Sequence, residues 1–350
     1  MIKKKFGIVL TTRNTYTMID EWYSLYDYTG VPILNLDLNS EKKYRAAGQE
    51  ICKKYGIDFL DANTTALQDN ILQAAQFFFE KKEIEWVLYM HHDAYPMEKN
   101  SLYNLDELLS NSKKMKKFGV IGFNVYHDQY DLKQFKKGHS KLMTTARTPL
   151  ELGNGYYSRK ISSRVNYNNF LNKPYAVESV FWSTVLINYF QYKKNIKIDF
   201  DFNFFNSWDD VAFQFLHKNI YNIVIPDISF AHDQSLKLKH NLPRSSPNGN
   251  PKLYGRTDHL KCWKNKWGFY YSASKYLFGG DYLLNRTGFI NKCIDKFSEI
   301  IHYDLTSSLQ TIARRSYKKH LESFPIKRRS LIDDFYNHDP KNGPLKYFDL

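Results

Sequence analysis

Apolar residues in the first 125 positions recur in two alternating rhythms. Short apolar runs, each bounded by polar or turn-forming residues, predict buried strands at residues 6–11, 32–38, 57–60, 85–90 and 118–123. The segments between them carry apolar residues three and four positions apart, which is the spacing of one helix face. They predict helices at residues 17–28, 41–55, 69–82 and 102–117.

This alternation of strand and helix predicts an α/β fold with a mostly parallel central sheet flanked by helices. Ligands bind such sheets at the carboxyl ends of the strands. The candidates for chemistry are therefore the residues that directly follow each strand. They are Thr11–Arg13, Asp37–Ser40, Asp61–Asn63 and His91–Tyr95.

The pattern changes beyond residue 125. Residues 125–175 are polar and suggest long loops, whereas residues 208–219 predict a helix and residues 221–231 a strand that ends at His232. Residues 237–254 are rich in Pro, Asn and Ser, and helix is expected after them, for example at 305–323. We expect one domain at 1–235, with halves at 1–124 and 125–235, followed by a loop at 236–270 and a helical basic extension at 271–350.

Composition narrows the class of protein. Of the 350 residues, 43% are hydrophobic, which is enough to build a packed core. Three cysteines without a CxxC pair argue against a disulfide framework or a cysteine zinc site. The first apolar stretch is too short for a signal peptide, and no run approaches the roughly 20 apolar residues of a membrane span. We therefore expect a cytoplasmic protein, or one bound peripherally to a membrane surface.

The net charge of +14 is concentrated near the C-terminus, where residues 236–350 hold 21 Lys and Arg against 10 Asp and Glu. A basic region of this kind suits an anionic membrane surface, a nucleic acid or an anionic polysaccharide. Motifs of nucleic-acid-binding folds are absent from the sequence, so no nucleic-acid partner is expected.

The sharpest chemical feature is the run from Val87 to Pro96, in which an apolar strand leads into His91, His92 and Asp93. Imidazole and carboxylate both bind divalent metals of intermediate hardness. Alternation along an extended chain would point His91 and Asp93 to one side and His92 to the other. The competing interpretation is a polar turn after a buried strand.

Two further features lie later in the chain. Asp209 and Asp210 begin a predicted helix, where they either cap the helix or form a carboxylate pair with a raised pKa that suits a general base. His232 ends its strand, and Lys266 precedes Trp267 and a glycine. Alone, each of these is more often structural or solvent-facing than functional.

In this order, the features resemble GT-A glycosyltransferases, in particular the inverting glycosyltransferase family 2. GIVLTTRN is similar to the opening strand and turn of that family, and ILNLDLNS to its second strand with an acidic residue at Asp37. Asn70 and VLYMHHDAYP are similar to the helix and strand that lead into the DxD motif, with His91 where the first Asp is expected. Trp208-Asp209-Asp210 looks like the family's base-bearing helix start. His232 and the Lys-Trp-Gly run complete the pattern over residues 5–270.

The resemblance implies inverting transfer of a sugar from a nucleotide donor to a hydroxyl group. It makes 1–235 the catalytic domain, with a donor-binding half at 1–124 and an acceptor-side half at 125–235, and it makes 236–270 the loop that closes the active site. It assigns Asp93, His91 and His232 to a divalent metal, Mn²⁺ or Mg²⁺, and Asp210 to the catalytic base, with Asp209 as the second choice. The donor would be bound by Thr11, Thr12, Arg13, Asp37, Asn39, Asn70, His92 and Lys266. The acceptor would be a glycan or lipid-linked saccharide of a bacterial surface polysaccharide such as capsule.

Two other functions are compatible with such a sheet. A sugar-phosphate nucleotidyltransferase would carry a glycine-rich phosphate loop after the first strand, but residues 11–20 contain no glycine. A catalytically degenerate carbohydrate-binding or scaffold protein is favoured by His91, because an imidazole removes one negative charge from the metal site.

Overall fold

The computed structural model describes residues 4–64, 66–127, 146–147, 173–180, 183–202, 207–233, 236, 239–240, 262, 265–267, 331, 334–335 and 345–350. The predictions for residues 128–145, 148–172 and 305–323 lie outside the described residues. The divisions placed at residues 236–270 and 271–350 fall almost wholly outside them, so the division of the chain stays a prediction.

The first half of the chain alternates strand and helix as predicted. The elements are β1 (Phe6–Thr12), α1 (Thr17–Ser24), β2 (Ile33–Asp37), α2 (Lys42–Tyr55), β3 (Asp58–Asp61), α3 (Leu67–Lys82), β4 (Trp86–Met90), β5 (Ala94–Pro96), α4 (Ser101–Asn111), the 3₁₀ helix η1 (Lys113–Lys117) and β6 (Ile121–His127). The later elements are β7 (Ala146–Arg147), β8 (Tyr175–Val177), β9 (Ser179–Val180), β10 (Thr184–Asn188), α7 (Tyr189–Asn195), α8 (Ser207–His217) and β11 (Asn222–His232).

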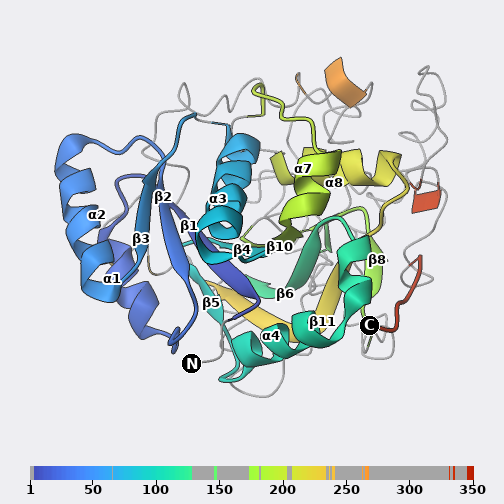
Figure 1. Ribbon diagram of the computed structural model, residues 1–350, viewed down its shortest axis with the longest axis horizontal. Helices are drawn as coiled ribbons and strands as arrows, with labels where there is room; N and C mark the ends of the chain where they lie inside the picture. The colour runs from blue at the N-terminus through green and yellow to red at the C-terminus, as the bar shows by residue number, and fades with distance from the viewer. Residues whose placement is uncertain are drawn as a thin grey trace, which may run out of the picture.

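Within the described residues, nine strands form one sheet in the order β3-β2-β1-β4-β10-β6-β11-β5, with β8 also paired to β11 (Figure 1). The pairs β1–β2, β1–β4, β2–β3 and β6–β11 are parallel. β10 is antiparallel to both of its neighbours, and β5 and β8 are antiparallel to β11. The mostly parallel sheet is therefore confirmed, with its antiparallel strands in the second half of the chain.

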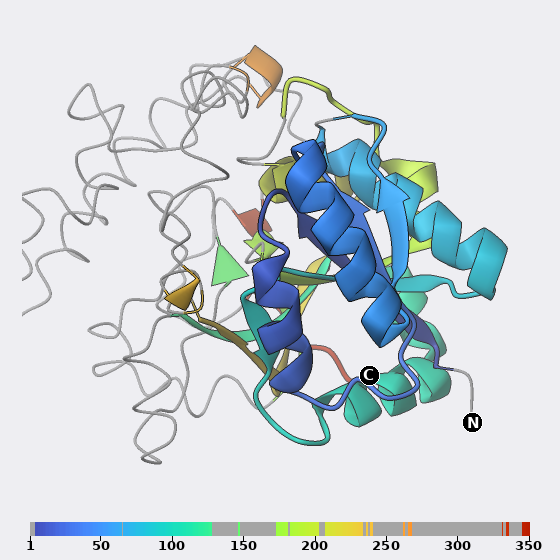
Figure 2. The ribbon, with the colours of Figure 1, turned by 90° about the vertical axis from the view of Figure 1, so that its left-hand side faces the viewer.

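Helices cover both faces of the sheet. One core lies under α3, α7 and α8, and the other under α1, α2 and α4. β1 shows why the sequence divides in this way, since Phe6, Ile8 and Leu10 enter the second core while Val9 enters the first. Figure 1 shows α3, α7 and α8 above the sheet and α4 below it, and the view in Figure 2 brings α1 and α2 to the front.

Two predicted helices are shorter than expected. α1 ends at Ser24 rather than at residue 28. The helix predicted at 102–117 was wrong as one element, because Ser112 takes an extended backbone conformation (φ −111°, ψ 100°) between α4 and η1. Met115 in η1 is still fully buried, so the apolar spacing continues across a break in the backbone. The strand predicted at 118–123 begins only at Ile121 and continues to His127.

The last described residues pack on the edge of the sheet. The Ala176 N–H donates to the Lys346 carbonyl at 2.8 Å, and the Phe348 N–H donates to the Pro174 carbonyl at 2.8 Å. The Phe348 ring meets that of Phe118 edge-on at 4.9 Å. Residues 345–350 therefore pack against β8 and against Phe118, the residue that follows η1. None of the helices in the described parts of the chain is long and apolar enough to cross a membrane.

Candidate active site

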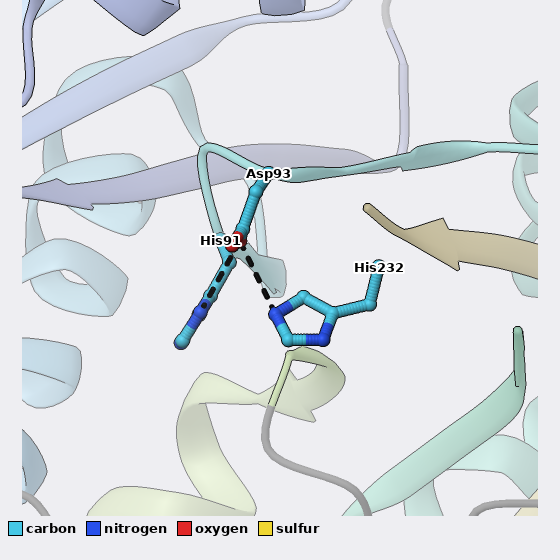
Figure 3. Close-up of side chains that lie close together, drawn as sticks. All are labelled: His91, Asp93 and His232. Carbon is cyan, nitrogen blue, oxygen red and sulfur yellow. Dashed lines mark ion pairs between the residues drawn. The ribbon is translucent and has the colours of Figure 1, made fainter. Parts of the chain in front are cut away.

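Two imidazoles and one carboxylate converge at the carboxyl end of β4. His91 Nδ1 lies 3.6 Å and His232 Nε2 3.3 Å from the same oxygen, Asp93 Oδ1 (Figure 3). One ligand atom from each of the three residues lies within 4.8 Å of the others. The sequence prediction that these residues share one site is consistent with this geometry.

Backbone hydrogen bonds fix this cluster. His91 to Asp93 form a turn between β4 and β5, closed by the Ala94 N–H, which donates to the His91 carbonyl at 2.9 Å. The His91 N–H donates to the Ser183 carbonyl at 2.9 Å, and the Asp233 N–H donates to the Asp93 carbonyl at 2.7 Å. The residues therefore face one another because of a tight turn, and not because of strand alternation as the sequence argument assumed.

β11, the strand that ends at His232, is irregular. Its register against β6 shifts between Ile225 and Ser229, where Asn124 Nδ2 donates to the Pro226 carbonyl at 2.5 Å. After this bulge β11 pairs with β6 and β5 through to His232. Bulges of this kind re-aim the residues that follow them, and they are common beside active sites.

The chemistry of the three side chains fits a divalent metal. His91 is 6% exposed, and Asp93 and His232 are 0% exposed. A carboxylate taken out of water requires a positive charge or several donors close to it. Two imidazoles with one carboxylate suit a cation of intermediate hardness such as Mn²⁺ better than a purely oxygen-seeking one.

The ends of β1 and β4 meet beside this cluster. Thr11 Oγ1 and the Tyr89 hydroxyl are 3.1 Å apart, and the Tyr89 ring meets the His91 ring edge-on at 5.4 Å. His92 Nδ1 lies 3.4 Å from the Thr11 carbonyl oxygen, and the His92 ring is nearly parallel to that of His91, with centroids 6.4 Å apart. Thr11 and His92, two predicted donor-binding residues, are thus brought together, and full burial raises the pKa of Tyr89.

Asp37 lies at the end of β2, as predicted, but both of its carboxylate oxygens have partners from the chain. Oδ1 accepts from the Ser40 N–H at 2.7 Å, and Oδ2 accepts from the Tyr16 hydroxyl. Burial, and then the hydrogen bond to Asp37, raise the pKa of Tyr16. Asn39, which lies between Asp37 and Ser40 in the sequence, is exposed and has a left-handed backbone (φ 61°). The turn after β2 is therefore preformed.

The remaining predicted donor residues lie close to the same strand ends. Thr12 Oγ1 donates to Asn35 Oδ1 at 3.0 Å and is buried, whereas Arg13 is partly exposed. Asn70, in the first turn of α3, is 0% exposed, and neither its amide nitrogen nor its amide oxygen has a hydrogen-bond partner in the described structure. An amide buried in this state points to a missing partner, such as a ligand.

Asp209 and Asp210 lie in the first turn of α8, and both are buried. Asp209 Oδ1 accepts from Ser179 Oγ at 2.6 Å. Asp210 Oδ2 accepts from the side-chain amides of Gln68 and Gln214, each at 2.8 Å. Burial raises the pKa of Asp210 above its usual value, opposed by the nearby lysine and by the two amides.

Lys266 and Trp267 complete the surroundings of Asp210. Lys266 Nζ lies 2.8 Å from Asp210 Oδ2 and 2.9 Å from Asp199 Oδ2, and Trp267 Nε1 donates to Asp210 Oδ1 at 2.8 Å. The Trp267 ring stacks on His217 at 4.9 Å. The ammonium group predicted to bind the donor's diphosphate is thus paired with two carboxylates of the chain itself.

Sequence reasoning missed Tyr16, Gln68 and Asp199. Gln68 was overlooked because the predicted helix began at residue 69, one residue too late to include it. The available signal for Gln68 was a polar pair, a glutamine and an asparagine two positions apart, at the start of an apolar helix face. No comparable signal marks Asp199, because its partner Lys266 is distant in the sequence.

The sequence matches no protein-family model and no curated protein. The structure is similar to that of GalNAc-T7 with UDP, GalNAc and Mn²⁺, at a TM-score of 0.50 and 11% identity. The match covers 91% of this chain and 58% of that one, so this chain spans less than two thirds of GalNAc-T7. Weaker matches include the mannosyltransferase PcManGT from Pyrobaculum calidifontis in complex with GDP-Man and Mn²⁺ (TM-score 0.44, 11% identity, 90% and 87% covered). TarS from S. aureus is another (TM-score 0.39, 15% identity, 66% and 60% covered).

The chain has a GT-A glycosyltransferase fold, with a central sheet of mostly parallel strands flanked by helices. At this identity the likeness shows the fold and not the reaction. The His91, Asp93 and His232 side chains could hold a metal at the strand ends.

Proposed function

We propose that this protein is a metal-dependent glycosyltransferase. It would move a sugar from a nucleotide-sugar donor to a hydroxyl group of a glycan or lipid-linked acceptor, with inversion. The observation that carries the proposal is the buried His91, Asp93 and His232 cluster at the carboxyl ends of the strands in a GT-A fold. GalNAc-T7, which shares the fold, was solved with UDP, GalNAc and Mn²⁺, which supports a nucleotide-sugar donor and a metal.

The three residues would hold the metal, Mn²⁺ or Mg²⁺, which would supply positive charge to the diphosphate leaving group. The rest of the donor site would be built by residues at neighbouring strand ends. The turn after β1 and the preformed turn after β2 would bind the base and ribose through Thr11, Thr12, Arg13, Asp37 and Asn39. His92 and the buried amide of Asn70 would complete this site.

The acceptor hydroxyl would attack the anomeric carbon while the bond from that carbon to the diphosphate oxygen breaks. Its proton would pass to Asp210, which is our proposed base, with Asp209 as the alternative. Burial raises the pKa of Asp210, and a base with a raised pKa takes a proton more readily near neutral pH. Asp210 Oδ1 accepts one donor, from Trp267, and a carboxylate oxygen has capacity for a second.

Lys266 would serve both the base and the leaving group. In the structure it neutralises Asp210 and Asp199, and we propose that it contributes charge to the diphosphate once the donor is bound. A role in bacterial surface polysaccharide synthesis, and peripheral association with an anionic membrane through the basic C-terminal part, belong to the same proposal.

A second function has one observation in its favour. Three donors converge on Asp210 Oδ2 and one on Oδ1, which is the arrangement of a structural carboxylate as much as of a base. A carbohydrate-binding protein on this fold would keep the network and would bind a nucleotide sugar without breaking it. A nucleotidyltransferase is disfavoured, since the turn after β1 lacks the glycine-rich loop of that class.

A panel of UDP- and GDP-sugars separates these functions. The protein is incubated with each donor and Mn²⁺, and release of the nucleoside diphosphate is measured alongside thermal stabilisation. Release with at least one donor supports the transferase. Stabilisation without release supports the binding protein, and neither effect with any donor contradicts both.

A further inference from the structure

Gln68 makes side-chain contacts to three residues of the acceptor-side half. It is the second residue of α3, on the donor-binding half of the sheet, and it is 1% exposed. Its side-chain nitrogen donates to Asp210 Oδ2 at 2.8 Å and to the Ser207 carbonyl at 3.3 Å. Its side-chain oxygen accepts from the Asp199 N–H at 2.9 Å.

These contacts use both N–H donors of the amide group and one of the two acceptor sites on its oxygen. Both N–H groups reach the first turn of α8, and the oxygen reaches the segment before α8. That segment in turn holds Lys266, since Asp199 Oδ2 lies 2.9 Å from Lys266 Nζ. A single buried side chain therefore fixes the proposed base, the turn that carries it and, through Asp199, the cation beside it.

The backbone of the same residue adds a fourth contact. The Tyr192 hydroxyl of α7 donates to the Gln68 carbonyl at 3.1 Å. Two residues further along α3 lies Asn70, which we assign to the donor. The first turn of α3 thus faces the proposed donor site with one residue and the proposed base with another.

Gln214 provides an internal comparison. Its amide also donates to Asp210 Oδ2 at 2.8 Å, but it lies on α8, four residues after Asp210, and its other contacts are to Lys197. Both glutamines stabilise the carboxylate, but of the two only Gln68 ties it to the helix of the donor half. A comparison of Gln68 and Gln214 variants therefore separates the link between the two halves from the stabilisation of the Asp210 carboxylate.

We propose that Gln68 is a positioning residue that holds Asp210 and the first turn of α8 in register with the donor site. This inference rests on the proposed function, because Asp210 is taken as the base. Misplacing a catalytic group by about 1 Å costs roughly 100-fold in rate. Loss of Gln68 should therefore lower kcat far more than it alters donor binding.

The test compares Gln68→Met, Gln68→Glu and Gln214→Met with the wild type in Mn²⁺-dependent hydrolysis of the best donor from the UDP- and GDP-sugar panel. Methionine conserves the side-chain volume but removes both polar atoms. Glutamate keeps the acceptor for the Asp199 N–H but places a carboxylate against Asp210. We expect kcat to fall by about 100-fold in both Gln68 variants and by no more than about tenfold in Gln214→Met, which also loses one hydrogen bond to Asp210 but keeps the link to α3. The KM for the donor should stay within about threefold throughout.

Hydrogen exchange of the Asp199 amide and of residues 207–210 tests the link without any donor. Faster exchange should appear in Gln68→Met and stay at the wild-type rate in Gln214→Met. An active wild type with unimpaired Gln68 variants would overturn the positioning role, and so would unchanged exchange. If no donor is hydrolysed by the wild type, the proposed function fails, and the exchange experiment alone decides whether Gln68 ties the two halves.

Discussion

Two of the buried carboxylates at the candidate site, Asp210 and Asp93, have contrasting surroundings. Asp210 receives hydrogen bonds from two amides, an ammonium group and an indole, all supplied by the chain. Asp93, equally buried, has two imidazole nitrogens 3.3 Å and 3.6 Å from one of its oxygens. The first carboxylate is paired with a lysine of the chain, whereas the second lies among imidazoles with which it could hold a cation.

The largest effect should follow the loss of the carboxylate in the metal cluster. Asp93→Asn removes the negative ligand, and metal assistance to a leaving group is worth several kcal/mol, so we expect donor hydrolysis to fall by about 1000-fold. Mn²⁺ binding, measured by electron paramagnetic resonance, should be lost as well. Asp61→Asn, at the exposed end of β3, is the matched control and should retain both. Wild-type hydrolysis in Asp93→Asn would remove this residue from the site.

The second effect separates a base from a structural carboxylate. Asp210→Asn keeps the shape of the side chain but loses the proton acceptor, so we expect hydrolysis to fall by about 100-fold or more while Mn²⁺ and donor binding persist. Isothermal titration with Mn²⁺ and the donor checks the second half of this statement. If Asp209→Asn shows the loss and Asp210→Asn does not, the base is the neighbouring residue.

A smaller effect concerns the charge of the metal cluster. His91→Asp would place a second carboxylate beside Asp93, and a harder, more negative site binds Mg²⁺ better. We expect the affinity for Mg²⁺ to rise by about tenfold, which is the scale of changes around a metal ligand. His92→Asp adds the same charge at a neighbouring residue that is not one of the three candidate ligands, and it should change the affinity much less. An equal gain in both variants would mean that overall charge, and not ligation, decides the affinity.

The smallest effect concerns the cation beside Asp210. Lys266 lowers the pKa of this carboxyl, while burial, the larger influence, raises it. Lys266→Met should therefore raise the pKa further. A base must be deprotonated, so activity is lost as the pH falls through this pKa, and the acid limb of the rate profile should move to higher pH. Lys239→Met, which removes a lysine paired with Glu21 at 2.7 Å, should leave the limb in place. An unmoved limb in Lys266→Met would contradict the assignment of Asp210 as the base.

Much of the fold follows from the sequence because the first half is locally regular. The continuous apolar run of β1, whose side chains alternate between the two cores, and the apolar stripe of α3 encode both elements directly. Strand direction is not encoded in this way, so the antiparallel β10 between β4 and β6 could not be predicted from periodicity. Periodicity could not reveal the break between α4 and η1 at Ser112 either, because the apolar spacing continues through it.

The grouping of His91, Asp93 and His232 was easier to predict than the network around Asp210. His91 and Asp93 are close in sequence, and His232 ends a recognisable strand, so all three fall at strand ends where ligands bind. The partners of Asp210 come from α3, α8 and residues 266–267, and only tertiary packing brings them together. Sequence reasoning found the carboxylate and the lysine but not their pairing.

The most direct test of the account is metal removal and return in the wild type. Release of the nucleoside diphosphate from the best nucleotide-sugar donor is followed before EDTA, after EDTA, and after Mn²⁺ is restored in excess. The account predicts that release stops with EDTA and returns with Mn²⁺. Release that continues unchanged in EDTA would contradict a metal held by His91, Asp93 and His232 as part of the reaction.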